Sequence, residues 1–290
     1  MILDRLRVLP QYLLPQHLAS VWMHRFMQVR RGWVKRLQIE VVRRLYDVRL
    51  EEALEPDPGA YPTFNAFFTR ALQPAARPIA PAPAVAAPAD GTVSAAGHVA
   101  HGELIQAKGR TYRLDELVVE PALAEAFADA AYATVYLSPR DYHRVHVPTD
   151  ATLRETLYVP GRLFSVNSTT TRTVPRLFAR NERLICVLDT ALGPMAVILV
   201  GAIFVGSMET VWGGQVTPPY GHEIVRQRYA PGTVRLARGA ELGRFNMGST
   251  VVLLCAGGAV RWREDLVFGR RVRMGEELGT WRADPGRDGG

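Results

Sequence analysis

The 290-residue sequence contains few cysteines and no long apolar run. Its two cysteines, Cys186 and Cys255, lie singly in apolar segments, which excludes a disulfide framework and the spacing of a zinc site. The longest apolar stretch, residues 195–206, is well short of the roughly 20 residues that a membrane-spanning helix needs. The N-terminus also lacks the apolar core of a cleaved signal peptide. We therefore expect buried thiols in a reducing compartment and no transmembrane segment.

Lysine is also scarce, since only Lys35 and Lys108 occur. An enzyme that uses pyridoxal phosphate needs a lysine to hold the cofactor, and Lys35 lies in a strongly basic segment. That leaves Lys108 as the one plausible attachment point. The sequence has neither a dinucleotide-binding glycine fingerprint nor a phosphate-binding P-loop. If the protein acts on amines, its carbonyl cofactor is expected to have another origin.

Positive charge is concentrated near the N-terminus. Residues 1–50 hold ten Arg and Lys against three acidic residues, an excess equal to the whole chain's net charge of +7. The remaining residues are balanced. A protein that binds nucleic acid more often spreads basic residues along a groove, so we expect no nucleic-acid partner and favour an anionic membrane surface.

The basic segment is predicted to be helical over residues 21–50. Val34, Leu37, Val41 and Leu45 recur at helical spacing, with basic residues between them. Tryptophan and phenylalanine side chains in the same segment suit a lipid interface. The spacing alone fits equally well an ordinary amphipathic helix that packs on the protein core, so both interpretations stay open.

The texture of the chain predicts an α+β fold, with an N-terminal helical region on a mainly antiparallel β core. Residues 1–75 are expected to form the helical, membrane-associating region and residues 76–290 the β-rich core, after a connector rich in proline and alanine. One helical patch is predicted at 113–130. The Gly- and Asp-rich end, residues 284–290, is expected to be frayed.

Three short segments carry side chains suited to catalysis. Asp90, His146 and Ser249 follow one another in the chain, and His143 precedes His146 by three residues. A serine hydroxyl becomes a good nucleophile when a histidine takes its proton and a carboxylate orients the histidine. The histidine pair has no obvious third ligand nearby, so no metal site is predicted. There is no G-x-S-x-G elbow of an α/β-hydrolase. The segments are Pro88–Val93, Asp141–Pro148 and Phe245–Thr250.

These segments together resemble the bacterial membrane-associated phosphatidylserine decarboxylases. The likeness runs in order from Phe64 to Cys255, with one departure at Met247, where the family usually has leucine before Gly-Ser-Thr. Methionine has a similar size and is apolar, so little effect is expected. Further segments that resemble the family are Phe64–Arg70, Tyr158–Asn167, Leu177–Arg183 and Val200–Ser207.

The resemblance implies a proenzyme that cuts itself between Gly248 and Ser249. The products would be a β chain of residues 1–248 and an α chain of residues 249–290. Ser249 Oγ would attack the carbonyl of Gly248, with His146 taking the hydroxyl proton and Asp90 orienting His146. Elimination from the resulting ester, followed by loss of ammonia, would leave a covalent pyruvoyl group at the position of Ser249.

The family's reaction is the conversion of phosphatidylserine to phosphatidylethanolamine and carbon dioxide. The resemblance implies that the pyruvoyl ketone forms a Schiff base with the substrate amine and accepts electrons as carbon dioxide leaves. His143 is the proposed donor of the proton that replaces the carboxylate. The implied location is the cytoplasmic face of the cell membrane, as a peripheral protein. Its partners would be phosphatidylserine in anionic membrane, the two chains of one precursor and, in a homodimer, a second αβ unit.

Three other interpretations stay open on the residues alone. A pyruvoyl enzyme could decarboxylate a soluble amino acid, although the basic N-terminal region argues against it. A Ser/His/Asp hydrolase would never cut itself. A non-enzymatic β-rich carrier or membrane-binding module would not depend on Ser249.

Overall fold

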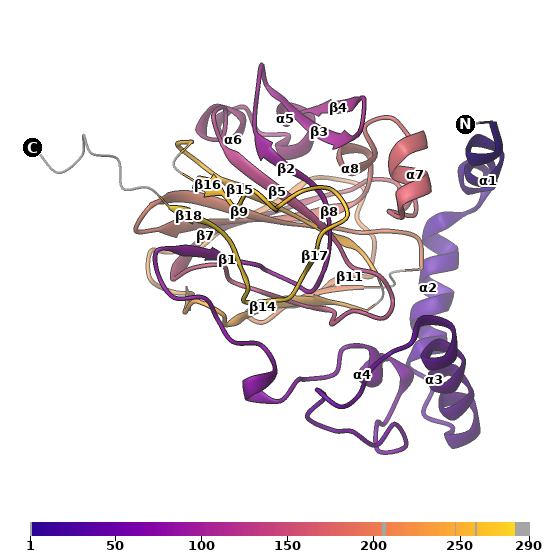
Figure 1. The fold of residues 1–290 in the computed structure, drawn as a ribbon. Coiled ribbons are helices and arrows are strands. Elements are labelled where there is room, and N and C mark those ends of the chain that lie inside the picture. The colour runs from indigo at the N-terminus through magenta and orange to yellow at the C-terminus, as the bar shows by residue number, and fades with distance from the viewer. Residues whose placement is uncertain (1, 205–206, 247, 259, 282–290) are drawn as a thin grey trace, which may run out of the picture.

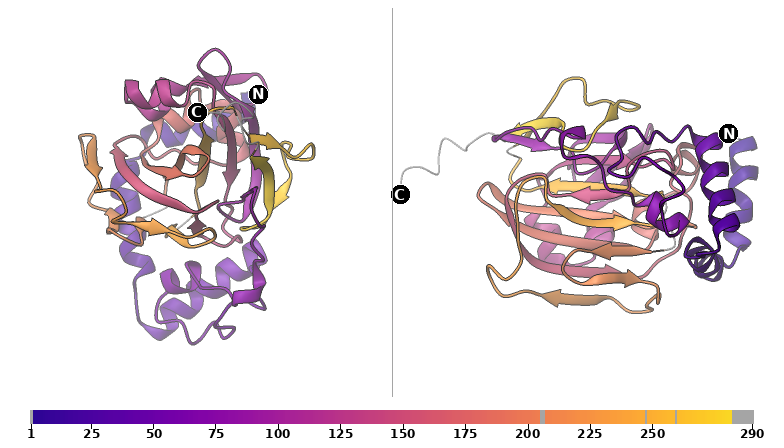
Figure 2. Two further views of the ribbon diagram at one scale, coloured as in Figure 1. Left: turned by 90° about the vertical axis from the view of Figure 1, so that its left-hand side faces the viewer. Right: turned by 90° about the horizontal axis from the view of Figure 1, so that it is seen from below.

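The computed structural model contains a body of β-sheets with the N-terminal helices beside it (Figures 1 and 2). The predicted α+β class and the mainly antiparallel core are confirmed. Two positions of interest, Met247 and the end predicted to fray at 284–290, lie outside the described residues. The structure describes every residue except 1, 205–206, 247, 259 and 282–290.

Helices occur in the N-terminal region and in two short groups within the body. The helical patch predicted at 113–130 is confirmed as a pair of short helices, whereas the two helices near residues 168–180 were not predicted. The helical elements are α1 (Ile2–Leu13), α2 (Gln16–Met27), α3 (Gly32–Tyr46), α4 (Phe64–Phe68), the 3₁₀ turn η1 (Pro74–Ala76), α5 (Leu114–Val118), α6 (Pro121–Ala126), α7 (Ser168–Thr173) and α8 (Leu177–Arg180).

The single helix predicted over residues 21–50 is wrong, because the chain turns between α2 and α3. No proline marks this break. Met27 at the end of α2 and Ile39 in α3 are both buried in one small apolar cluster, and the turn allows both to reach it. Gln38 Nε2 also donates to the carbonyl of Phe26, which ties the two helices together. Tertiary packing therefore overrides the helical periodicity.

In the described part of the chain the strands form four sheets, and every strand pairing within them is antiparallel. They are β1 (Ala84–Ala86), β2 (Gly91–His98), β3 (Glu103–Ala107), β4 (Arg110–Arg113), β5 (Ala131–Tyr136), β6 (Arg144–His146), β7 (Ala151–Val159), β8 (Arg183–Thr190), β9 (Gly193–Val200), β10 (Met208–Thr210), β11 (Gly214–Thr217), β12 (Val225–Arg228), β13 (Arg235–Leu236), β14 (Glu241–Phe245), β15 (Thr250–Cys255), β16 (Val260–Trp262), β17 (Arg271–Val272) and β18 (Glu277–Trp281).

The largest sheet has nine strands, and β15 lies at its centre between β9 and β5. The main path runs β12-β7-β8-β9-β15-β5-β2-β17, and β13 pairs with β7. A second sheet has the order β11-β10-β14-β6. All six residues of β15 are buried, as expected for an uninterrupted apolar strand that is covered on both faces. The short connection between β14 and β15 therefore crosses from one sheet into the middle of the other.

The N-terminal helices have a small apolar core of their own. It comprises nine buried residues from α2, α3, α4 and the segment between α3 and α4. The helices are fastened to the body by polar side chains. Gln11 and Gln16 accept hydrogen bonds from the backbone N–H groups of Ser165 and Leu163, at 2.8 and 2.9 Å. In the described part of the chain, no helix is both long and apolar enough to cross a bilayer.

Candidate active site

Ser249 lies where the chain leaves the smaller sheet and enters the central strand of the larger one. It is fully buried directly before β15, and its carbonyl accepts a hydrogen bond of 2.8 Å from the N–H of Leu137. Its Oγ has no hydrogen-bond partner among the described residues. A buried hydroxyl without a partner costs free energy, so its presence needs an explanation other than stability.

Gly248 is held closely against the neighbouring chain. A Cβ added at this position would lie 3.1 Å from the carbonyl oxygen of Leu137, which is tighter than an ordinary contact. It would also lie 3.8 Å from Nε2 of His143. The predicted cleavage site is therefore a crowded place that favours glycine, with an imidazole nitrogen beside it.

His143 is fully buried in the uncut chain, and its two ring nitrogens differ. Nδ1 donates to the carbonyl of Asp141 at 2.8 Å, whereas Nε2 has no partner among the described residues. Burial, reinforced by the positive charge of Arg70, lowers the pKa of His143 to about 3. The ring of Phe68 lies against it, with 4.0 Å between centroids. His143 is thus neutral near pH 7, and its free Nε2 can accept a proton.

His146 has a partner for each ring nitrogen. Nδ1 donates to the carbonyl of Gly239 at 2.8 Å, so Nε2 is the acceptor in its 2.9 Å hydrogen bond with the Tyr142 hydroxyl. Burial lowers the pKa of His146, while the carboxylates of Glu241 and Asp90 act in the opposite direction. His146 is therefore oriented by a carbonyl and a phenol.

Asp90 is engaged by an arginine that the sequence did not single out. Arg77 donates to both carboxylate oxygens, at 2.9 and 2.6 Å, and the N–H of Met274 adds a third bond at 2.7 Å. Arg77 also donates to Glu52 at 2.7 Å, which links this ion pair to the segment after α3. Asp90 and His146 share a neighbourhood, since the charge of Asp90 raises the pKa of His146, but their hydrogen bonds in the described residues go to other groups.

A strand pairing and a backbone hydrogen bond position the predicted residues. The antiparallel pairing of β6 with β14 places the histidine segment beside the strand that leads to the cleavage site, and Phe245 N–H donates to the carbonyl of His143 at 3.0 Å. The backbone N–H of His146 donates to the carbonyl of Pro88 at 2.7 Å, close to Asp90. The structure therefore brings His143 to Gly248, and His146 to the Asp90 segment.

A pocket of about 470 Å³ opens beside Asp90 and Tyr142. Six arginines and five carboxylate side chains contribute to its wall. Asp47, Arg49 and Glu52, in the segment directly after α3, form part of that wall, so the N-terminal region borders the pocket. The lining residues are Asp47, Arg49, Glu52, Arg70, Leu72, Arg77, Asp90, Arg140, Asp141, Tyr142, Arg271, Val272, Arg273 and Glu276.

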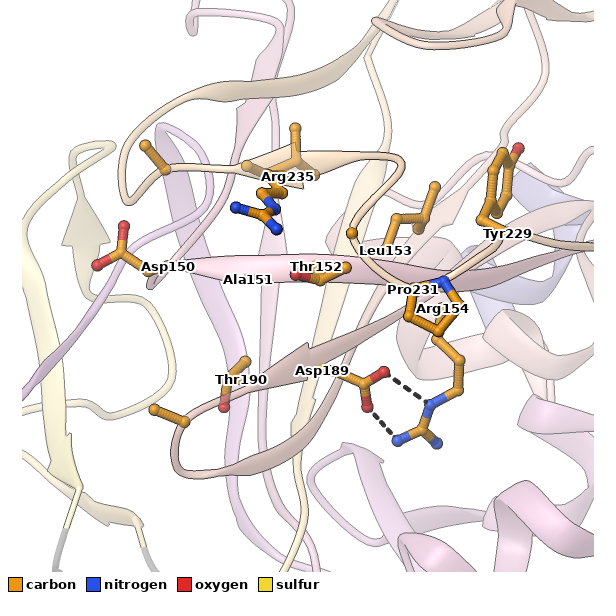
Figure 3. Close-up of a pocket in the computed structure, with 14 residues that line it drawn as sticks. Asp150, Ala151, Thr152, Leu153, Arg154, Asp189, Thr190, Tyr229, Pro231 and Arg235 are labelled. Atoms are coloured by element: carbon orange, nitrogen blue, oxygen red, sulfur yellow. Dashed lines mark hydrogen bonds and ion pairs between the residues drawn. The ribbon is translucent and has the colours of Figure 1, made fainter.

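A larger depression, of about 930 Å³, lies elsewhere on the body (Figure 3). It is bordered by β7, the turn between β8 and β9, and the loop around Pro231, and it contains an ion pair between Arg154 and Asp189. None of the predicted catalytic residues lines it. Size therefore does not identify the site in this molecule.

The cysteines follow the sequence-based expectation that they are buried. Cys186 in β8 and Cys255 in β15 are both fully buried as free thiols, and burial raises the pKa of each. Among the described residues, no group of three or more His, Cys, Asp or Glu side chains is arranged to hold a metal ion.

The structure thus has a buried serine without a hydrogen-bond partner after a crowded glycine, with His143 beside that glycine and His146 in the neighbouring Asp90 segment. A family model described as phosphatidylserine decarboxylase matches residues 64–280, and a second one, described only as PSD, matches residues 6–47. The chain therefore belongs to the phosphatidylserine decarboxylase family, and the resemblance inferred from the sequence is confirmed.

Curated relatives match over nearly their full length. A phosphatidylserine decarboxylase proenzyme of Methylococcus capsulatus is 53% identical over 274 residues, which is 94% of this chain and 95% of the relative. Proteins with the same name from Azotobacter vinelandii and Ectopseudomonas mendocina are 52% and 51% identical, over 95% and 96% of this chain and 98% of each relative.

The structure adds three residues to those proposed from the sequence. Tyr142 and Arg70 lay within segments that resembled the family, but neither was assigned a role. Arg77 lay in the connector, where nothing distinguished it from other arginines. A motif search could have suggested Tyr142 because it directly precedes His143, whereas the pairing of Arg77 with Asp90 depends on the folded chain.

Proposed function

We propose that this chain decarboxylates phosphatidylserine to phosphatidylethanolamine, with a pyruvoyl group that it makes from Ser249 by cutting itself after Gly248. Membership in the phosphatidylserine decarboxylase family supports the reaction, and the word proenzyme in the relatives' names supports the self-cleavage. The observation that carries the cleavage site is the buried Ser249 Oγ without a partner, next to a glycine that has an imidazole nitrogen beside it.

The residues around Ser249 fit such a group. In the uncut chain, attack of Ser249 Oγ on the carbonyl of Gly248 would form an ester and break the amide, and a nearby base must remove the hydroxyl proton. His143 has an unpartnered Nε2 beside Gly248, and His146 has an acceptor Nε2 that is bonded to the Tyr142 hydroxyl in the uncut chain. A pyruvoyl ketone at position 249 would supply the electron sink that the loss of carbon dioxide requires.

For the two histidines we retain separate roles. His146, supported by the charge of Asp90, accepts the proton of Ser249 during self-cleavage, and His143 delivers the proton during decarboxylation. The closeness of His143 Nε2 to Gly248 favours an alternative in which the two roles are exchanged. Because cleavage and decarboxylation are measured separately, single substitutions distinguish the two assignments.

The helical region is proposed to dock on the membrane. Exposed apolar side chains form a stripe at four-residue spacing along α3, at Trp33, Leu37, Val41 and Leu45, with exposed fractions from 44 to 70%. Contiguous exposed apolar surface of this kind marks an interaction site. The stripe supports the lipid interpretation of the helical spacing over packing on the core.

Similar exposure occurs on α1 and α2, and basic residues accompany it. Leu18, Trp22 and Phe26 repeat the four-residue spacing on α2 and are 51 to 62% exposed. Arg36 and Arg44 are exposed on α3. Basic residues attract anionic lipid by about 1 kcal/mol each, and apolar side chains enter the headgroup boundary. We further propose that the protein binds peripherally at the cytoplasmic face of the cell membrane. We also propose that two αβ units form a homodimer.

The deciding experiment measures carbon dioxide release by the purified protein from vesicles that contain phosphatidylserine. We expect release from the lipid and none from free serine, and we expect Ser249→Ala to abolish it while the variant still binds vesicles. Release from serine but not from the lipid would instead support a decarboxylase for soluble amino acids. An uncut, inactive wild-type chain with a serine reactive to fluorophosphonate would support the hydrolase.

A further inference from the structure

Arg70, two residues after α4, is a buried cation that makes few hydrogen bonds. Its side chain and backbone together are 4% exposed. Nε and Nη1 have no partner among the described residues, and Nη2 makes one long contact of 3.5 Å with the carbonyl of Arg140. Burying a guanidinium without partners is costly, so such a group is normally matched by acceptors.

Arg183 shows how this chain satisfies a buried arginine when the role is structural. It is 1% exposed, and its three nitrogens donate to four backbone carbonyls at 2.7 to 2.9 Å. Arg70 has no such set. The guanidinium lies over the Phe67 ring, 5.7 Å from its centroid, but a ring face does not replace hydrogen-bond acceptors, so Nε and Nη1 are left for acceptors from outside the chain.

The position of Arg70 connects the arginine-rich pocket with the buried histidine. Arg70 lines the pocket together with Asp90 and Tyr142. Its charge also acts on His143, whose pKa it lowers, and Phe68, two residues earlier in the chain, packs on the His143 ring. A ligand that reaches Arg70 from the pocket therefore comes close to the proposed catalytic centre.

The carboxylates nearby are already engaged. Asp90 is held by Arg77 through two bonds, and Asp141 accepts from Arg271 at 2.6 Å and from the backbone and hydroxyl of Ser138 at 2.8 Å each. The charge of Arg70 therefore remains available to an anion that enters the pocket.

We propose that Arg70 binds the phosphodiester of the substrate lipid, an inference that rests on the proposed function. The fork of an arginine matches two phosphate oxygens at once. The carboxylate of the same substrate is a poorer partner, because it leaves as neutral carbon dioxide. If Arg70 paired with that carboxylate, it would stabilise the ground state more than the transition state and slow the reaction. The phosphodiester keeps its charge throughout, so holding it costs nothing in the chemical step.

The test uses the processed enzyme and short-chain phosphatidylserine dissolved as monomers, so that vesicle binding does not enter. We expect Arg70→Gln to raise KM by about 30-fold or more while kcat falls much less, because removing one partner of a buried charge pair weakens binding strongly. Arg70→Lys keeps the charge without the fork and is expected to lie between. Arg140→Gln removes the same charge from an exposed side chain of the pocket wall and should raise KM by less than about threefold.

Two small anions separate the parts of the substrate. Diethyl phosphate is a phosphodiester without amine or carboxylate, and propionate is a carboxylate without phosphate. We expect diethyl phosphate to inhibit the wild type and to lose that effect in Arg70→Gln, while inhibition by propionate is equal in both. Inhibition by propionate that depends on Arg70, or an unchanged KM in Arg70→Gln, would overturn the proposal.

A binding measurement keeps this proposal separate from the proposed function. Diethyl phosphate should raise the Tm of the wild type but not that of Arg70→Gln, because a ligand of the folded state stabilises it. That result needs no turnover, so it can hold even if the protein released no carbon dioxide from the lipid. If Arg70→Gln does not fold, the same comparison is made with Arg70→Lys, which should show a smaller rise, and an equal rise would refute the proposal.

Discussion

The helical region and the β body use apolar residues in opposite ways. Of the 22 large apolar side chains that are exposed among the described residues, 13 lie within residues 1–50. In the body, strands such as β9 and β15 bury long apolar runs on both faces. The net charge of the chain also belongs to the first 50 residues. The difference sets a helical region that presents apolar and basic side chains to its surroundings apart from a body that buries its apolar residues, including those around the proposed cleavage site.

Within the body, the two histidines are expected to differ most in function. We expect His146→Ala to leave the chain uncut and His143→Ala to be cut but unable to decarboxylate, because each lacks the proton transfer of one step. Intact mass measures the cut, and carbon dioxide release measures the reaction. A cut His146→Ala together with an uncut His143→Ala would exchange the two roles.

The buried ion pair of the body should matter far more than an exposed one. Arg77→Met leaves the Asp90 carboxylate buried without its partner and is expected to lower the free energy of unfolding by about 3–5 kcal/mol. Arg154→Met breaks the pair with Asp189, whose side chains are both more than 40% exposed, and should cost less than about 1 kcal/mol.

Urea unfolding of the two substitutions, each made in the Ser249→Ala background, gives this comparison on a single uncut chain. Equal losses would show that burial of the Asp90 pair contributes nothing special to the body.

Glu182 is expected to make the stability of the β body depend on pH. Burial raises the pKa of this carboxyl group to about 7, and its side chain accepts a 2.9 Å hydrogen bond from Tyr158. A raised pKa in the folded state means that the unfolded state loses its proton first as pH rises. The wild type should therefore lose about 3 kcal/mol of stability relative to Glu182→Gln between roughly pH 4.5 and somewhat above pH 7.

Chemical denaturation of the wild type and Glu182→Gln at several pH values measures this difference. The two curves should meet below pH 4.5, and parallel curves from pH 4 to 8 would show that Glu182 titrates normally.

The helical region should show the smallest effect on chemistry and a clear effect on binding. The double substitution Trp33→Gln with Leu37→Gln removes two side chains of the exposed stripe and is expected to weaken binding to anionic vesicles by about tenfold or more. Turnover of dissolved short-chain substrate should not change.

Phe268→Gln is the matched control, because Phe268 is an exposed aromatic residue outside the N-terminal helices. Vesicle sedimentation at several salt concentrations measures both variants. Equal weakening by the control, or unchanged binding by the double variant, would contradict a docking surface on α3.

Much of this architecture was predictable from local sequence. The texture of the chain predicted the helical region and the mainly antiparallel β core, and the segments around Asp90, the two histidines and Ser249 predicted the family. The helical spacing of Val34, Leu37, Val41 and Leu45 was recognised, but spacing cannot tell whether apolar residues face a core or solvent, and the exposed stripe begins at Trp33 in place of Val34. The exposure of Leu37 and Leu45 answers that question only once the helices are folded.

The sequence could not predict the hydrogen-bond partners of Asp90 and His146. Among the described residues, the Asp90 carboxylate accepts from Arg77 and makes no direct hydrogen bond with His146. The ring nitrogens of His146 bond to the Tyr142 hydroxyl and the Gly239 carbonyl. Both choices follow from the meeting of β6, β14 and the connector, which are far apart in the chain. The break between α2 and α3 has the same origin, because it follows from the cluster that Met27 and Ile39 share.

The central claim is that Ser249 cuts its own chain and becomes the cofactor. The most direct measurement is the intact mass of the purified protein under denaturing conditions. The account predicts two species, residues 1–248 and 249–290, the smaller one lighter than its encoded mass by one ammonia. A single chain of full encoded mass, still uncut after prolonged incubation with anionic vesicles, would contradict it.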